Sequence, residues 1–153
     1  MRIIIASVGK LTTVSPLHTL CSEFMQRVPW DIVIKEVEEK RPLPVERLKE
    51  REAELLLKCL PEHCMIIALD ETGRTPSSTE FATLLSHWQE EAPPVIAFLI
   101  GGANGHAALI KQRANYLLSL GKMTWPHMLV RVMLTEQLYR AHTILTGHPY
   151  HRG

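Results

Sequence analysis

The sequence predicts an α/β fold, a mostly parallel sheet flanked by helices, on three observations. Short apolar runs of strand length alternate with amphipathic stretches of helix length along the chain. The run Val95–Ile100 is apolar without interruption, as in a strand buried on both faces of a parallel sheet. It ends in Gly101-Gly102, at the strand end where open α/β sheets bind ligands. A length of 153 residues fits one domain, residues 1–153.

Three further strands are expected before this central one. They are the isoleucine-rich segment Arg2–Val8, the alternating segment Asp31–Val37 and the apolar segment Met65–Asp70. Glu71-Thr72-Gly73 is expected to turn the chain out of the last of them, and Pro93-Pro94 precedes the central strand.

Amphipathic periodicity predicts five helices between and after these strands. Ser15 before Pro16 is a typical N-cap, and Ser77 with Glu80 forms a capping box. The expected helices cover residues 16–28, 45–60, 77–91, 106–120 and 126–146. A short extended piece, Gly121–Trp125, separates the last two, and a non-helical tail follows Thr146.

The final helix carries two apolar faces. One broad face holds Val130, Met133, Leu134, Leu138, Ala141, Ile144 and Leu145, and a narrower one holds Met128, Val132 and Tyr139. We expect the sheet to bury the first face. A partner subunit covers the second in one interpretation, and deep burial within the chain explains it in the other.

Composition restricts the class of protein. No segment approaches the roughly 20 apolar residues of a membrane span. The apolar run at the amino terminus is too short for the hydrophobic region of a signal peptide. Cys21, Cys59 and Cys64 are odd in number and have no C-x-x-C spacing, which favours free thiols in the cytoplasm. After residue 105 six basic residues face one acid, so an anionic partner such as RNA and a chance asymmetry both stay open.

Several common sites are excluded by spacing. The segment 101–105 is not G-x-G-x-x-G, and no acid follows at the distance that a dinucleotide ribose needs. The chain has no G-x-x-x-x-G-K-[S/T] and no H-E-x-x-H. The late histidines lack accompanying carboxylates or cysteines, so no metal site is expected.

Four collinear motifs resemble one family over the full length of the chain. They are Leu-Ile-Gly-Gly at 99–102, Ser119-Leu120 with Met123-Thr124 and Pro126-His127, the segment Glu136–Ala141, and Pro149-Tyr150-His151-Arg152. Together they resemble the RlmH family, the ribosomal large-subunit pseudouridine methyltransferases of the SPOUT class. Leu69-Asp70 with Gly73, and Ser78 with Phe81-Ala82, match the middle of that family.

The resemblance implies a SPOUT-type sheet with a C-terminal trefoil knot and a homodimer. It implies S-adenosyl-L-methionine as the methyl donor and N3 of a pseudouridine in 23S rRNA, within the assembled ribosome, as the acceptor. The residues that it places around the cofactor are Leu69, Gly101, Leu120, Gly121, Lys122, Met123, Thr124 and Trp125. Asn104 stands where the family commonly has an acid, and Gly121 where it commonly has a serine.

The tail motif suggests the groups that handle the nucleotide. We expect His151 to accept or relay the N3 proton, Tyr150 to stack on or hydrogen-bond to the base, and Arg152 and Arg131 to bind phosphates. In a SPOUT dimer this tail is expected to reach the cofactor site of the other subunit. A disordered tail is the alternative. Two other functions stay open: a non-catalytic ribosome-associated RNA-binding protein of the same fold, and a SPOUT methyltransferase acting on tRNA.

Overall fold

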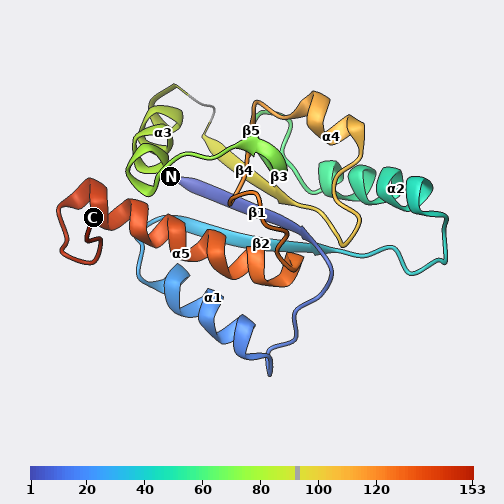
Figure 1. Ribbon diagram of the computed structural model, residues 1–153, viewed down its shortest axis with the longest axis horizontal. Coiled ribbons are helices and arrows are strands. Elements are labelled where there is room, and N and C mark those ends of the chain that lie inside the picture. Colours follow the sequence, from blue (N-terminus) through green and yellow to red (C-terminus); the bar gives the residue numbers. More distant parts are fainter. Residues whose placement is uncertain (92–93) are drawn as a thin grey trace.

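Five parallel strands form the sheet of the computed structural model, which describes residues 1–91 and 94–153. Their order is β2-β1-β4-β3-β5, and every neighbouring pair is parallel (Figure 1). The strands are β1 (Arg2–Val8), β2 (Asp31–Val37), β3 (Met65–Arg74), β4 (Val95–Ile100) and β5 (Tyr116–Leu118). The helices are α1 (Pro16–Gln26), α2 (Val45–Lys58), α3 (Ser78–Glu91), α4 (Ala108–Arg113) and α5 (His127–Thr146). The predicted α/β class with a parallel sheet is confirmed. Pro93, expected to precede the central strand, lies outside the described residues.

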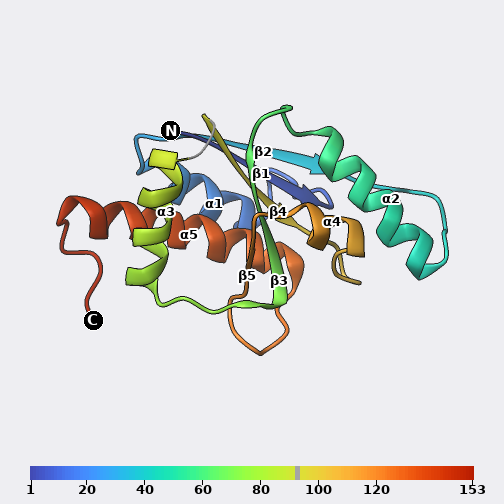
Figure 2. The same ribbon diagram turned by 90° about the horizontal axis from the view of Figure 1, so that it is seen from above.

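Helices cover both faces of the sheet, and the side-chain alternation of β1 shows how. Ile3 and Ile5 belong to the core that α3 and α5 complete, whereas Ile4 and Ala6 belong to the core under α2 and α4. Figure 1 shows α2 and α4 above the sheet and α5 below it, and Figure 2 gives the same arrangement seen from above. Burial on both faces explains the unbroken apolar run of β4, in which all six residues are buried.

The helix starts follow the capping signals of the sequence. The Ser15 hydroxyl accepts a hydrogen bond from the amide of Leu17 at 3.2 Å. Ser77 Oγ accepts from the amide of Glu80 at 3.1 Å, and Glu80 Oε2 accepts from the amide of Ser77 at 3.2 Å. Both predicted N-termini are therefore confirmed to within one residue.

The narrower apolar face of α5 is covered in part by the same chain. Tyr139 is buried, with its ring 6.0 Å from Phe24 of α1 and 4.6 Å from Tyr150 of the tail. Val132 is also buried. Burial within the chain thus accounts for these two residues, and a covering partner subunit stays a prediction.

The expected single helix over residues 106–120 is wrong. Helix α4 ends at Arg113, and β5 begins at Tyr116. Asn115 directs the chain from the helix into the sheet. Its amide donates to the carbonyl of Ile66 at 2.8 Å, and its side-chain oxygen accepts from the Ile66 amide at 2.8 Å. This pairing aligns the next three residues with β3, and three residues are too few for a strand period to be recognised in the sequence.

The expected turn at residues 71–73 is also wrong, because β3 continues to Arg74. Its register against β5 shifts between Leu69 and Arg74. At Gly73 a Cβ would lie 2.6 Å from the backbone of Leu117, so only glycine allows the two strands to come this close.

No helix within residues 1–91 or 94–153 has both the length and the apolar character needed to cross a membrane. The three cysteines are free thiols, and burial raises the pKa of each. Threading of α5 into a trefoil knot stays a prediction.

Candidate functional site

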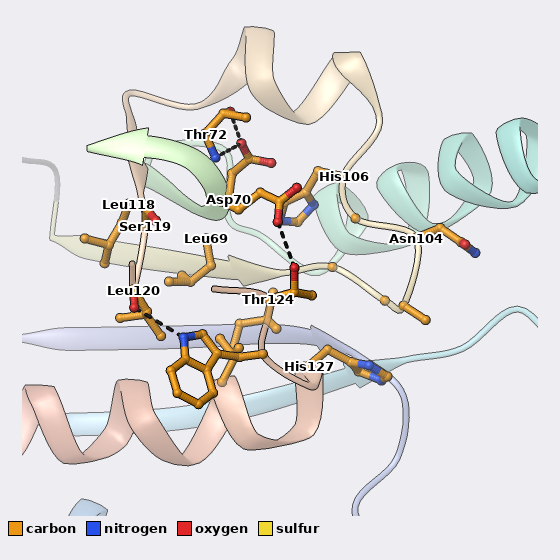
Figure 3. A pocket seen from close by; sticks show the side chains of 18 of the residues that line it. Leu69, Asp70, Thr72, Asn104, His106, Leu118, Ser119, Leu120, Thr124 and His127 are labelled. Carbon is orange, nitrogen blue, oxygen red and sulfur yellow. Dashed lines mark hydrogen bonds between the residues drawn. The ribbon is translucent and has the colours of Figure 1, made fainter. Parts of the chain in front are cut away.

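A cavity of about 430 Å³ opens at the carboxyl edge of the sheet (Figure 3). The register of the strands creates it: Leu69 of β3 pairs with Ile100 of β4 and with Leu118 of β5. These three residues therefore lie side by side where β4 and β5 end, and the segments that follow them enclose the space. All three apolar side chains line the cavity floor.

The loop after β4 forms one wall as a tight glycine turn. The amide of Gly105 donates to the carbonyl of Gly102 at 3.0 Å, and Gly105 has a φ of +79°. A Cβ on Gly101 would lie 3.1 Å from the carbonyl carbon of Gly105, closer than side chains usually pack. The turn thus brings bare backbone to the cavity, and Asn104 lines it from an exposed position.

The segment after β5 forms the opposite wall as a loop, not as the expected extended piece. Ser119 Oγ donates to the carbonyl of Gly121 at 2.8 Å and accepts from the Gly121 amide at 3.1 Å. Gly121 has a φ of +112°, a left-handed conformation that disfavours the serine common at this position in the family that the chain resembles.

Two side-chain contacts hold the far part of this loop over the cavity. The hydroxyl of Thr124 donates to Glu71 Oε2 at 3.3 Å, from the loop to β3. The indole of Trp125 donates to the carbonyl of Leu120 at 3.3 Å (Figure 3). The loop therefore bridges β3 and its own first turn.

A carboxylate stands at the cavity wall beside these apolar residues. Asp70 accepts hydrogen bonds from the amide and hydroxyl of Thr72, and Lys111 Nζ lies 3.6 Å from its Oδ1. Burial acts to raise the pKa of Asp70, but the Thr72 hydrogen bonds and the nearby charges of Lys111 and His106 outweigh it, so the pKa lies below its ordinary value. Asp70 is ionised at neutral pH.

Two histidines also line the cavity. Burial lowers the pKa of His106, whose Nε2 lies 3.1 Å from the carbonyl oxygen of Leu99, so this ring holds the end of β4. Burial and then the charge of Arg131 lower the pKa of His127. Sequence reasoning named neither histidine nor Asp70 as a site residue; for Asp70 the available signal was an acid at the end of a predicted strand.

The structure brings together nearly all the residues expected around a cofactor. Those that line the cavity are Leu69, Gly101, Leu120, Gly121, Met123, Thr124 and Trp125. Lys122 does not line it, and its side chain is exposed. In the part of the chain that the structure describes, no group of three or more His, Cys, Asp or Glu side chains is arranged to hold a metal ion.

The tail residues lie against α5 and do not line this cavity. The hydroxyl of Tyr150 donates to Glu136 Oε1 at 3.0 Å, and Arg140 Nη1 donates to His151 Nδ1 at 3.0 Å. Arg152 is exposed. A second cavity of about 510 Å³ is lined by Glu136 and shares the wall segment 118–121 with the first.

Arg131 is placed differently from the expectation. Its side chain is only 2% exposed, and it donates to Glu36 Oε2 at 2.6 Å, to Ser7 Oγ at 2.9 Å and to the carbonyl of Gly9 at 3.2 Å. The guanidinium is thus occupied inside the protein and offers no surface to an RNA phosphate. Arg131 fastens α5 to the ends of β1 and β2.

Comparison with known proteins gives the fold its family. A family model described as "Predicted SPOUT methyltransferase" matches residues 1–151. The chain belongs to the SPOUT methyltransferase family. In this SPOUT methyltransferase the cavity and the glycine turn lie at the carboxyl edge of the sheet.

Relatives of this SPOUT methyltransferase match it from end to end. The "Ribosomal RNA large subunit methyltransferase H" of Paramagnetospirillum magneticum is 55% identical over 152 residues, 99% of each chain. The protein of the same name from Rhodospirillum centenum is 47% identical over 153 residues, the whole of each chain. A solved probable methylase family protein from Haemophilus influenzae Rd KW20 has a TM-score of 0.55 at 11% identity, covering 99% of this chain and 70% of that one, and supports the fold alone.

Proposed function

We propose that this chain is an S-adenosyl-L-methionine-dependent rRNA methyltransferase that methylates N3 of a pseudouridine in 23S rRNA. The observation that carries the proposal is the full-length similarity to large-subunit rRNA methyltransferases, together with a cavity lined by the matching motif residues. Similarity of this extent covers both the cavity walls and the C-terminal tail.

The cavity fits the donor by its chemistry. Leu69, Leu118 and Ile100 offer apolar walls to a flat, neutral adenine, and the backbone at Gly101 and the 119–125 loop offers hydrogen-bond donors and acceptors. The carboxyl groups of Asp70 and Glu71 at the cavity wall suit a ligand that carries positive charge on sulfur and on its amino group. The ligand has no phosphate group, so the site needs no phosphate-binding motif. The short helix after the glycine turn, α4, with only six residues, agrees with this.

The chain's own residues position the reaction. When bound, S-adenosyl-L-methionine supplies a methyl group, which passes from its sulfur to N3 of the nucleotide. The glycine turn and the 119–125 loop restrict the orientation of whatever occupies the cavity, and the Thr124–Glu71 hydrogen bond ties that loop to β3. These residues contribute alignment, which is the main requirement of an in-line displacement.

The tail supports a homodimeric arrangement. In one protomer Tyr150 and His151 lie on α5 and Arg152 is exposed, while the cavity is lined by other segments. Figure 1 shows the C-terminus beyond the end of α5, away from the loops at the carboxyl edge. A second copy whose tail faces this cavity would complete the site in trans. The assembled ribosome in the cytoplasm is the proposed setting.

Methylation of ribosomes tests the proposal. Ribosomes from a strain without this protein are incubated with the purified enzyme and labelled S-adenosyl-L-methionine, alongside naked rRNA and total tRNA. We expect label in 23S rRNA of 70S particles, as 3-methylpseudouridine by mass spectrometry. Label in tRNA would identify a tRNA enzyme. Failure to bind the donor in calorimetry would identify a non-catalytic RNA-binding protein.

A further inference from the structure

A chain of three side chains leads from α5 to the tail. Arg140 donates two hydrogen bonds to Glu136 Oε1, from Nε at 2.9 Å and from Nη2 at 2.7 Å. Its remaining terminal nitrogen, Nη1, donates to Nδ1 of His151 at 3.0 Å. The Tyr150 ring lies 4.8 Å from the Arg140 guanidinium carbon, and its hydroxyl donates to the same Glu136 oxygen. The guanidinium is therefore held from three directions.

This geometry fixes where the imidazole carries its hydrogen. A guanidinium has only donors and stays protonated in proteins. Nδ1 of His151 must therefore accept, and it accepts only when it carries no hydrogen. The hydrogen of the neutral ring is then on Nε2. Protonating Nδ1 would break the bond and set a second cation beside Arg140.

We propose that Glu136 and Arg140 are positioning residues that keep His151 as its neutral Nε2–H tautomer, so that His151 is a hydrogen-bond donor to the target base. This replaces the proton acceptor expected from the sequence, and it rests on the proposed methylation of pseudouridine. The charged or titratable groups that contact the imidazole and its holder are Glu136 and Arg140 from α5 and Tyr150 from the tail.

A donor has a defined use in this chemistry. When the N3–H bond of pseudouridine breaks, the proton leaves to solvent water and the electron pair stays on the base. The resulting negative charge is shared between N3 and the two carbonyl oxygens beside it. The Nε2–H of His151 donates to one of these oxygens and stabilises the anion, as donors in an oxyanion hole do. No protein group has to take the proton.

Nitrogen NMR measures the tautomer directly in the unmodified protein. With ¹⁵N-labelled histidine, we expect the neutral His151 ring to show its hydrogen on Nε2 and none on Nδ1. His148, whose Nδ1 accepts from the Tyr150 amide, serves as an internal reference. In Arg140→Met the His151 preference should weaken. A wild-type His151 with its hydrogen on Nδ1 would overturn the proposal, whatever the activity.

Two substitutions of His151 distinguish a role as hydrogen-bond donor from a role as general base in the methylation assay. A glutamine amide can place an N–H near the imidazole Nε2 position but cannot accept a proton at neutral pH. His151→Gln should therefore keep activity within about tenfold of wild type, whereas His151→Ala should lose about 100-fold or more. The pH dependence of His151→Gln should parallel that of the wild type.

The outcomes keep the two proposals apart. Equal loss in both His151 variants, with a neutral limb of the pH profile present only in wild type, would assign His151 as the base and overturn the donor role. A wild-type protein that methylates no RNA would overturn the proposed function and the role at the base with it, while the NMR result still decides the tautomer.

Discussion

Removing the buried ion pair between Arg131 and Glu36 should destabilise the fold, and the structure gives the size of the effect. Arg131 reaches Glu36 Oε2 at 2.6 Å and also holds Ser7 and Gly9. Its side chain is 2% exposed and that of Glu36 is 29% exposed. The pair therefore joins α5 to two strand ends with little competing water. The variants are Arg131→Met, Glu36→Gln and the double variant.

The magnitudes follow from what each change leaves behind. Breaking a buried pair by removing one partner costs 3–5 kcal/mol, and Glu36 is exposed enough to regain some water, so we expect about 3 kcal/mol for Arg131→Met. Glu36→Gln keeps an acceptor for the buried guanidinium but removes its counter-charge, for about 2 kcal/mol. The double variant should fall short of the sum by at least about 1 kcal/mol, because the two side chains contact each other.

Urea unfolding at a fixed protein concentration measures these free energies, since assembly would otherwise change them. Burial acts to raise the pKa of Glu36, but the hydrogen bonds from Arg131 and the Leu11 amide and the charges of Arg131 and Lys10 together hold the pKa below its ordinary value of 4.5. The stabilisation is therefore complete above pH 4.5 and is lost as the pH falls further, a dependence that Glu36→Gln should reduce. A loss under about 1 kcal/mol in Arg131→Met, or strict additivity, would refute the reasoning.

Three other substitutions, one of them with a matched control, test the two cavity loops and a buried acid. Gly101→Ala should weaken binding of S-adenosyl-L-methionine at least tenfold in calorimetry, about 1.4 kcal/mol, because the new Cβ would lie 3.1 Å from Gly105. Lys122→Ala is the matched control. It removes an exposed side chain that does not line the cavity and should change the affinity little. Gly121→Ala should cost about 1–2 kcal/mol in urea unfolding, because its φ is +112°. Burial raises the pKa of Glu52, whose Oε1 has no hydrogen-bond partner, so ionisation destabilises the fold as pH rises above 4.5. Glu52→Gln should therefore stabilise the protein by about 1 kcal/mol at pH 7, and this gain should shrink toward pH 4.

Local signals in the sequence predicted the parts of the fold that depend on neighbours along the chain. The apolar run of β4 and its terminal glycines predicted both a buried strand and the position of the cavity, because strand ends in a parallel sheet meet at one edge. The capping box at Ser77 and Glu80 likewise fixed the start of α3.

Long-range contacts decided the parts that the sequence did not predict. The strand β5 exists because Asn115 pairs with Ile66, 49 positions away. Arg131 is a charged residue of the final helix, and only its contact with Glu36, 95 positions away, reveals that its side chain is buried. Helical spacing alone cannot distinguish a buried ion pair from an RNA-binding surface.

Subunit complementation tests the two-chain site most directly. Mixed dimers of Gly101→Ala and His151→Ala protomers are formed by joint unfolding and refolding, and methylation of 70S ribosomes is measured against each variant alone. If the tail of one chain serves the cavity of the other, activity should recover to about a quarter of the wild-type value, since about half of the dimers are mixed and each has one intact site of two. Activity no higher than that of either variant alone would place tail and cavity of the same chain in one site.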